Sequence, residues 1–247
     1  MKIEIKNRWT KEIIFSIEAD SMKNALEIGV KQKINFRNCD FRNCDLRGCS
    51  FFGANFRGST FSGCDLSKVN FRICSFNGST FSGCNFSESS FYKTAFCGSD
   101  FSGCNFNGSI FCKCNFRGCD LYCDWTCGIF INCNFRKIRL FESDLSSVKS
   151  DFWDVLKLVP EEIKGLKKAI IHGKVNGSVH DGEYACLFGI ISYLRKFKYN
   201  EINIEKHNIK RPIERFFSAI KKNDTPWNSQ FSKLAVEWID EFLIGGY

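Results

Sequence analysis

The chain has 247 residues, with 35 Lys and Arg against 27 Asp and Glu, which gives a formal net charge of +8. It has no run of 18 apolar residues, so we expect no membrane-spanning helix, and its N-terminal residues lack the apolar core of a secretory signal. The basic residues are spread evenly along the chain without a dense run, so we expect a mixed-charge surface and no nucleic-acid partner.

Residues 1–33 predict a β-hairpin followed by a helix. Apolar residues alternate at Ile3 and Ile5, and again from Ile13 to Ile17, with a polar turn between the two runs. Ser21 is a suitable N-cap for a helix over residues 22–31. We expect this segment to cap the open edge of the domain that follows.

A period of five organises residues 34–147. From Phe36 to Leu121 every fifth residue is Phe or Leu, eighteen times in succession, and the residue two positions earlier is small in every unit except the first. Neither a helix nor a strand keeps such a column on one side. A chain that turns a corner every five residues keeps all of these side chains on its inner side. Four corners then close a coil of twenty residues with the Phe and Leu side chains inside, and successive coils stack through β-bridges.

Residues twenty apart are vertical neighbours in such a stack. One column consists of identical residues, namely Cys44, Cys64, Cys84 and Cys104. After Leu121 the period slips by one residue, and the next apolar centres are Trp125, Phe130, Phe135, Leu140 and Leu145. The four-residue step at 121–125 predicts a tightened corner or a local distortion.

Units such as CDFRN at residues 39–43 closely resemble the pentapeptide-repeat family, and the resemblance covers residues 34–147. It implies a mainly β fold, a right-handed quadrilateral β-helix, with the N-terminal hairpin and helix as a cap. The characterised members of this family are mostly not enzymes, so the resemblance also implies a protein without catalytic activity.

The five-residue period ends near residue 148, and helical patterns predict an α-helical domain over residues 148–247. We expect five helices, which run from Ser150 to Val159, from Pro160 to a stop at Gly173, from Glu183 to Phe197, from Pro212 to Lys222 and from Asn228 to Leu243.

Fifteen cysteines are present, and nine of them occupy the small-residue position of the repeat. We expect them to be buried free thiols, which favours a reducing, cytoplasmic location. Stacked cysteines point the same way and cannot surround one metal ion tetrahedrally, so we expect no metal and no other cofactor.

The segment from Lys174 to Cys186 concentrates groups that can carry chemistry: Ser178, His180, Asp181, Glu183 and Cys186. A Cys near a His and a carboxylate can act as a nucleophile with its base, and His, Glu and Cys can bind zinc. The dipeptides Asn176-Gly177 and Asp181-Gly182 are also ordinary turn formers, so we favour a structural role. The segment is similar to one near the C-terminus of pentapeptide-repeat proteins from bacteria and phages.

We therefore expect a non-catalytic scaffold that binds another protein. The alternative that the resemblance implies is a topoisomerase-protecting DNA mimic. Such a mimic needs an acidic surface, whereas residues 34–147 hold twelve basic and nine acidic residues. Two further alternatives, which we favour less, are nucleic-acid binding through the arginines of the repeat and an enzyme centred on His180, Glu183 and Cys186.

Overall fold

The computed structural model describes residues 1–123, 128–131, 133–140, 145–177, 186–195 and 212–245. The chain divides by its contacts into two compact units, Met1–Ile129 with Cys133–Ser143, and Phe130–Asn132 with Asp144–Tyr247. The elements up to residue 131 are β1 (Lys2–Lys6), β2 (Ile13–Glu18), α1 (Met22–Lys31), β3 (Ser50–Phe52), β4 (Asn70–Arg72), β5 (Ser90–Tyr92), β6 (Ile110–Cys112) and β7 (Ile129–Ile131).

The N-terminal segment forms the predicted hairpin and helix. Strands β1 and β2 pair antiparallel, and the alternating Ile3 and Ile5 are buried. Helix α1 begins after Ser21, whose hydroxyl accepts a hydrogen bond from the backbone N–H of Asn24 at 3.2 Å. The predicted helix start at residue 22 is confirmed.

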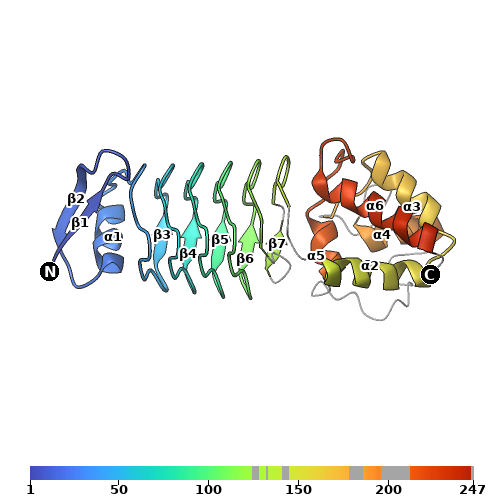
Figure 1. The fold of residues 1–247 in the computed structure, drawn as a ribbon, viewed down its shortest axis with the longest axis horizontal. Helices are drawn as coiled ribbons and strands as arrows, with labels where there is room; N and C mark the ends of the chain where they lie inside the picture. Colours follow the sequence, from blue (N-terminus) through green and yellow to red (C-terminus); the bar gives the residue numbers. More distant parts are fainter. Residues whose placement is uncertain (124–127, 132, 141–144, 178–185, 196–211, 246–247) are drawn as a thin grey trace. The chain divides into compact units, whose positions relative to one another are not determined.

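This segment covers the first coil of the repeat (Figure 1). The ring of Phe15 meets the ring of Phe36 edge to face, with 6.0 Å between centroids. Gly29 of α1 lies so close to Phe36 that an added Cβ would be 2.5 Å from its Cζ. The backbone N–H of Asp40 donates to the carbonyl of Lys6 at 3.0 Å, which continues the ladder onto the hairpin.

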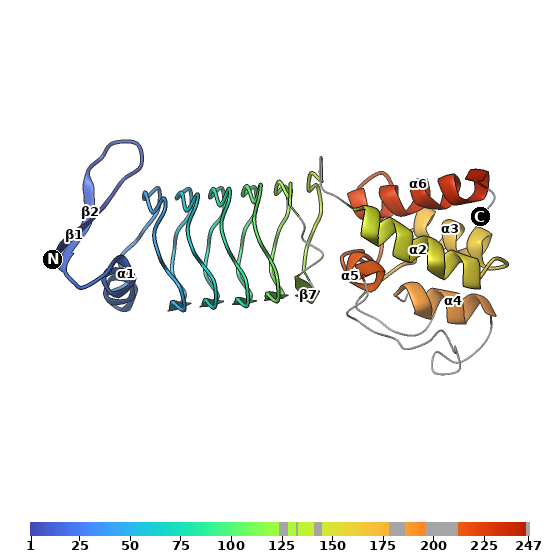
Figure 2. The same cartoon turned by 60° about the horizontal axis from the view of Figure 1, so that its bottom comes forward.

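The repeat is a four-sided β-solenoid, as the period of five predicts. Strands β3, β4, β5, β6 and β7 form a parallel sheet in sequence order along one side of the coils (Figures 1 and 2). Phe51 pairs with Phe71, and Phe71 with Phe91, so the register advances by twenty residues per coil. Single bridges, such as Thr60 with Thr80, join the coils elsewhere.

Stacked phenyl rings fill the interior. All eighteen Phe and Leu centres from Phe36 to Leu121 are at most 2% exposed. Most rings one coil apart stack nearly parallel, as in Phe91 and Phe111 with centroids 4.5 Å apart, although Phe71 and Phe91 meet edge to face. Most rings of successive units within a coil meet at steep angles, as in Phe96 and Phe101 at 72°. Both arrangements are favourable for aromatic pairs, so the interior is packed and apolar.

The small residues of the repeat do more than pack. The Oγ of Ser79 donates to the carbonyl of Phe56 at 2.9 Å, and the Sγ of Cys84 donates to the carbonyl of Phe61 at 2.9 Å. The same bond to the centre residue 23 positions earlier recurs along the repeat, for example from Ser99 to Phe76 at 2.7 Å. Ser, Thr and Cys fit this position because each is small and also donates a hydrogen bond.

The position two residues after each centre from Phe36 to Phe116 turns the corner with a positive φ. Gly occupies it ten times between residues 48 and 118, with φ from 66° to 71°. The same backbone is adopted at Ile73, with φ of 58°. Only glycine reaches this region without a steric penalty, which accounts for its recurrence.

The slip after Leu121 changes the register by one residue. Before it, bridged residues are twenty apart, as in Asp100 with Asp120. After it they are nineteen apart, since Asn115 bridges Asn134 and Asp120 bridges Arg139. The ladder therefore continues across a shortened coil. Trp125, a predicted centre, lies outside the described residues.

The C-terminal region is α-helical, as predicted. Its described helices are α2 (Ser146–Leu158), α3 (Ile163–Ile171), α4 (Leu187–Arg195), α5 (Pro212–Ser218) and α6 (Gln230–Gly245). Its core is mostly aliphatic, with aromatic contacts at its centre: Phe216 packs on Phe231 and on Trp238, with centroids 5.1 and 4.9 Å away. Among the described helices, none combines the length and hydropathy that a bilayer-spanning segment requires.

Two predicted helix starts were wrong by three residues or more, whereas α6 starts two residues after the predicted Asn228. Helix α2 begins at Ser146 rather than after Ser150, and Leu145, predicted as the last repeat centre, is its N-cap residue. Pro160 lies in a turn three residues before α3 rather than in its first turn, whereas Gly173 does follow the end of α3, with φ of 67°. The predicted helix from Glu183 lies partly outside the described residues.

Candidate interaction surface

The segment predicted to carry chemistry is described at one of its five candidate residues. Ser178, His180, Asp181 and Glu183 lie outside the described residues. Cys186 is 2% exposed, directly before α4, and its carbonyl accepts from the N–H of Ile190 at 2.9 Å. The role of the segment stays a prediction.

Burial makes many thiols of the repeat poor nucleophiles, but Cys44, which we expected to be buried, is partly exposed, and a hydrogen bond with Cys64 lowers its pKa. All the cysteines that the structure describes are free, and burial raises the pKa of Cys39, Cys84 and Cys119 to about 12. Within the described ranges, no group of three His, Cys, Asp or Glu side chains lies close enough to hold a metal ion.

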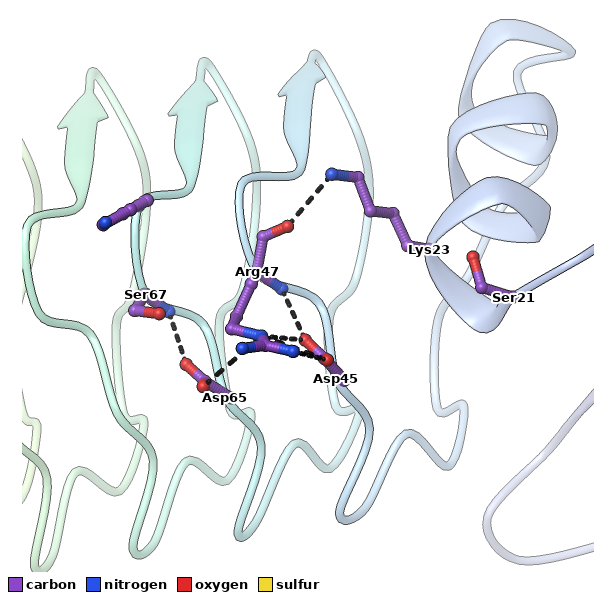
Figure 3. Close-up of a pocket in the computed structure, with 7 residues that line it drawn as sticks. Ser21, Lys23, Asp45, Arg47, Asp65 and Ser67 are labelled. Atoms are coloured by element: carbon purple, nitrogen blue, oxygen red, sulfur yellow. Dashed lines mark hydrogen bonds and ion pairs between the residues drawn. The ribbon is translucent and has the colours of Figure 1, made fainter.

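An open polar groove of about 580 Å³ lies beside α1 (Figure 3). It is lined by Ser21, Lys23, Asp45, Arg47, Asp65, Ser67 and Lys68. The Nε of Arg47 donates to Asp45 at 2.8 Å and lies 3.8 Å from Asp65, while Lys23 donates to the backbone carbonyl of Arg47 at 3.0 Å. The bond from Arg47 lowers the pKa of Asp45 to about 2. These contacts neutralise the charges of Arg47, Asp45 and Asp65, and the bond from Lys23 connects α1 to the coils. The groove therefore has a structural role.

Charge is segregated around the coil. The Asp and Glu of residues 34–123 all fall in one pair of adjacent sides, formed by residues 40–49, 60–69, 80–89, 100–109 and 120–123. The other two sides, formed by residues 50–59, 70–79, 90–99, 110–119 and 129–138, have no acidic residue. We call these two sides the cationic half. It carries seven basic residues: Arg57, Arg72, Lys93, Lys113, Arg117, Arg136 and Lys137.

The acidic side chains are bound by their neighbours. Arg42 forms an ion pair with Asp40 at 2.7 Å, and Lys68 forms one with Glu88 at 3.7 Å. Asp100 accepts from the hydroxyl of Ser82 at 2.6 Å. In contrast, five exposed cations of the cationic half have no carboxylate partner among the described residues: Arg57, Arg72, Lys93, Lys113 and Arg117. This half of the surface therefore presents uncompensated positive charge.

Tyr92 is at the centre of a cation cluster on strand β5. The guanidinium carbon of Arg72 lies 5.4 Å from the centroid of the Tyr92 ring, and the ammonium groups of Lys93 and Lys113 lie 5.4 and 5.9 Å from it. Arg72 is the direct ladder neighbour of Tyr92 in the parallel sheet. The register thus brings together residues twenty apart in sequence.

Large apolar side chains are exposed on the same strand side. They are Phe52 at 69% and Ile110 at 40% on the strands, and Ile73 at 49% at the corner that follows β4. Single exposed apolar residues are common on proteins, but here they lie on the side of the coils that carries the Tyr92 cluster. Arginine and aromatic residues among apolar ones are the composition of protein-interface cores.

Comparison with known families identifies the repeat. A family model described as "Pentapeptide repeat region" matches residues 34–109, and one described as "Pentapeptide repeats (8 copies)" matches residues 99–123. The chain carries a pentapeptide-repeat domain. No curated protein sequence matches the chain.

Several solved pentapeptide-repeat structures are similar to this chain. A trypsin-treated form of QnrB1, a plasmid-mediated fluoroquinolone resistance protein, is 23% identical with a TM-score of 0.29, and the match covers 44% of this chain and 61% of that one, so this chain spans less than two thirds of it. A protein from the Arabidopsis thaliana thylakoid lumen is 19% identical, with a TM-score of 0.21 and coverage of 40% and 63%. Rfr23 from the cyanobacterium Cyanothece 51142 is 12% identical, with a TM-score of 0.18 and coverage of 50% and 98%.

The cationic half of this pentapeptide-repeat domain was not predicted, because a net charge summed over the whole repeat averages its two halves. In blocks of ten residues from 40 to 123, acidic residues occur only in every second block. That signal was available, because a twenty-residue coil places every second block of ten on the same two sides.

Proposed function

We propose that this protein is a non-catalytic scaffold whose pentapeptide-repeat domain binds another protein through its outer surface. The observation that carries the proposal is the cationic half, where exposed cations and apolar side chains lie together on coils held by continuous ladders. Such a surface is presented rigidly, which reduces the entropic cost of binding.

The chemistry of the described repeat supports a non-catalytic role. Its interior is filled by stacked rings, so it offers a substrate no cavity there. Its buried hydroxyls and thiols donate to backbone carbonyls, as in Ser99 to Phe76 and Cys119 to Phe96 at 2.7 and 2.8 Å. Its carboxylates are bound by neighbouring Arg, Lys and Ser side chains. Groups engaged in this way are poor acids, bases and nucleophiles.

We do not favour the topoisomerase-protecting DNA mimic. A mimic of duplex DNA presents a row of negative charge, whereas half of this surface has no acidic residue. If the mimic proposal were correct, the purified protein would restore DNA supercoiling by gyrase in the presence of a quinolone. We expect no restoration.

The proposal is tested by isolating the tagged, full-length protein from its own cells after nuclease treatment. A protein that co-purifies in a stable ratio should form the same complex again from purified components, as measured by isothermal titration calorimetry. Recovery of nucleic acid alone, or of proteins that do not bind when purified, would contradict the proposal.

A further inference from the structure

The cationic half also defines the chemistry of its partner, and this inference rests on the proposed function. We infer that its strand side, formed by β3 to β7, binds an acidic protein segment that carries aromatic or aliphatic side chains among its carboxylates. Three cations surround Tyr92 on this side, and no acidic residue lies on β3 to β7 or on the corner residues that follow them. Charge complementarity therefore selects an anionic partner.

The apolar residues make a protein a better partner than a nucleic acid. Phe52 and Ile73 are about half exposed or more, and a phosphate backbone offers nothing to cover them. Base stacking on Tyr92 is also hindered, because Arg72 and Lys113 already lie over its ring. An acidic segment with apolar side chains satisfies both features, since carboxylates meet the cations while apolar groups cover the isoleucines and Phe52.

The geometry of the sheet also favours an extended segment that runs across the strands. The outward residues Phe52, Arg72, Tyr92 and Cys112 are direct ladder neighbours and form one column. Adjacent strands lie about 4.8 Å apart, so side chains on one face of an extended chain, about 6.8 Å apart, span the column in a few residues. A short peptide is therefore long enough to reach Phe52 and Lys113 together.

The inference is tested by measuring how the full-length protein binds defined probes at low salt, by fluorescence anisotropy. The probes are a random copolymer of glutamate and tyrosine, polyglutamate, and a 30-nucleotide DNA as a single strand and as a duplex. We expect the glutamate–tyrosine copolymer to bind at least about fivefold more tightly than polyglutamate or either DNA.

The matched variants locate the binding face. Arg72→Gln, Lys93→Gln and Lys113→Gln combined should weaken copolymer binding about tenfold. The control combines Lys2→Gln, Lys68→Gln and Lys157→Gln, which removes the same charge elsewhere. Lys68 is a close match because it occupies the same corner position as Lys93 and Lys113, with φ of 58° against 51° and 56°. The control should change binding less than twofold, and circular dichroism should show both variants folded.

Four outcomes would overturn the inference: tighter binding of DNA, equal binding of polyglutamate, equal losses in the two triple variants, or no binding of the copolymer. None of these outcomes would contradict the binding of a partner found by co-purification. The proposed function and this inference can therefore fail separately.

Discussion

The Sγ of Cys84 lies 2.9 Å from the backbone carbonyl oxygen of Phe61, a residue of the preceding coil. The same carbonyl accepts a hydrogen bond from the backbone N–H of Cys64 at 2.9 Å. Most of the Ser, Thr and Cys residues at this position thus add a side-chain bond between coils to the bonds of the backbone.

This contact predicts that the position requires a hydrogen-bond donor and that a hydroxyl can replace the thiol. Cys84→Ala should lower the free energy of unfolding by about 1 kcal/mol, because it removes one buried hydrogen bond. Cys84→Ser should cost less, since Ser79 makes the same bond in another column. Urea denaturation of both variants measures the difference. Equal losses would contradict a role for the donor.

The positive φ at Ile73 predicts that glycine at this position would stabilise the fold. It is a β-branched residue at φ of 58°, and its side chain is 49% exposed, so little packing is lost on its removal. Ile73→Gly should raise the free energy of unfolding by about 0.5–1 kcal/mol, since the relieved strain exceeds the entropic cost of glycine.

The matched control is Gly78→Ala at φ of 68°, where an added Cβ would meet nothing within 4 Å. It should destabilise by about 1 kcal/mol through the backbone alone. Thermal unfolding of both variants measures these changes. A loss of stability in Ile73→Gly would show that the side chain matters more than the backbone.

The lowered pKa of Asp45 predicts that the folded protein loses stability in acid. Its pKa is lowered from 3.8 to about 2 by the hydrogen bond from Arg47, so the folded state binds its proton less readily than the unfolded state. Its contribution is present above about pH 4 and disappears as the pH falls toward 2. Arg47→Gln should move the pKa of Asp45 back toward its ordinary value in an NMR titration. It should also flatten the pH dependence of unfolding in that range, and an unchanged titration would contradict the assignment.

Buried thiols should react more slowly than partly exposed ones. The pKa of Cys84 and of Cys119 is raised to about 12 by burial, so almost no thiolate is present at pH 8 in the folded state. Iodoacetamide should therefore modify the partly exposed Cys44, Cys97 and Cys112 first, and the buried pair only after denaturation. Peptide mapping by mass spectrometry follows the order. Early modification of Cys84 would indicate that the coils open locally.

The sequence predicted the solenoid well because its strongest signal is geometric. A five-residue period with no interruption from Phe36 to Leu121 leaves one arrangement in which all centres are buried. The bond from Cys84 to Phe61 was not predicted, because the same residue types are small as well as hydrogen-bond donors, and size alone explained their recurrence.

The start of α2 was missed because Leu145 continues the five-residue spacing by coincidence. The buried residues Val148, Phe152 and Val155 form a helical stripe that requires a start before residue 148. The site was harder to predict, since the Tyr92 cluster joins residues from different coils. Only the exact twenty-residue register shows that Arg72 and Tyr92 are neighbours.

That register also restricts how the domain can change in length. Removing residues 70–89 deletes one whole turn and leaves every later residue on its original side. Removing a single unit of five between Arg72 and Tyr92 would rotate all later residues by a quarter turn, so that Tyr92 would no longer align with Arg72. Growth or loss by whole turns is therefore the route by which such a chain can lengthen or shorten while keeping its two differently charged surfaces apart.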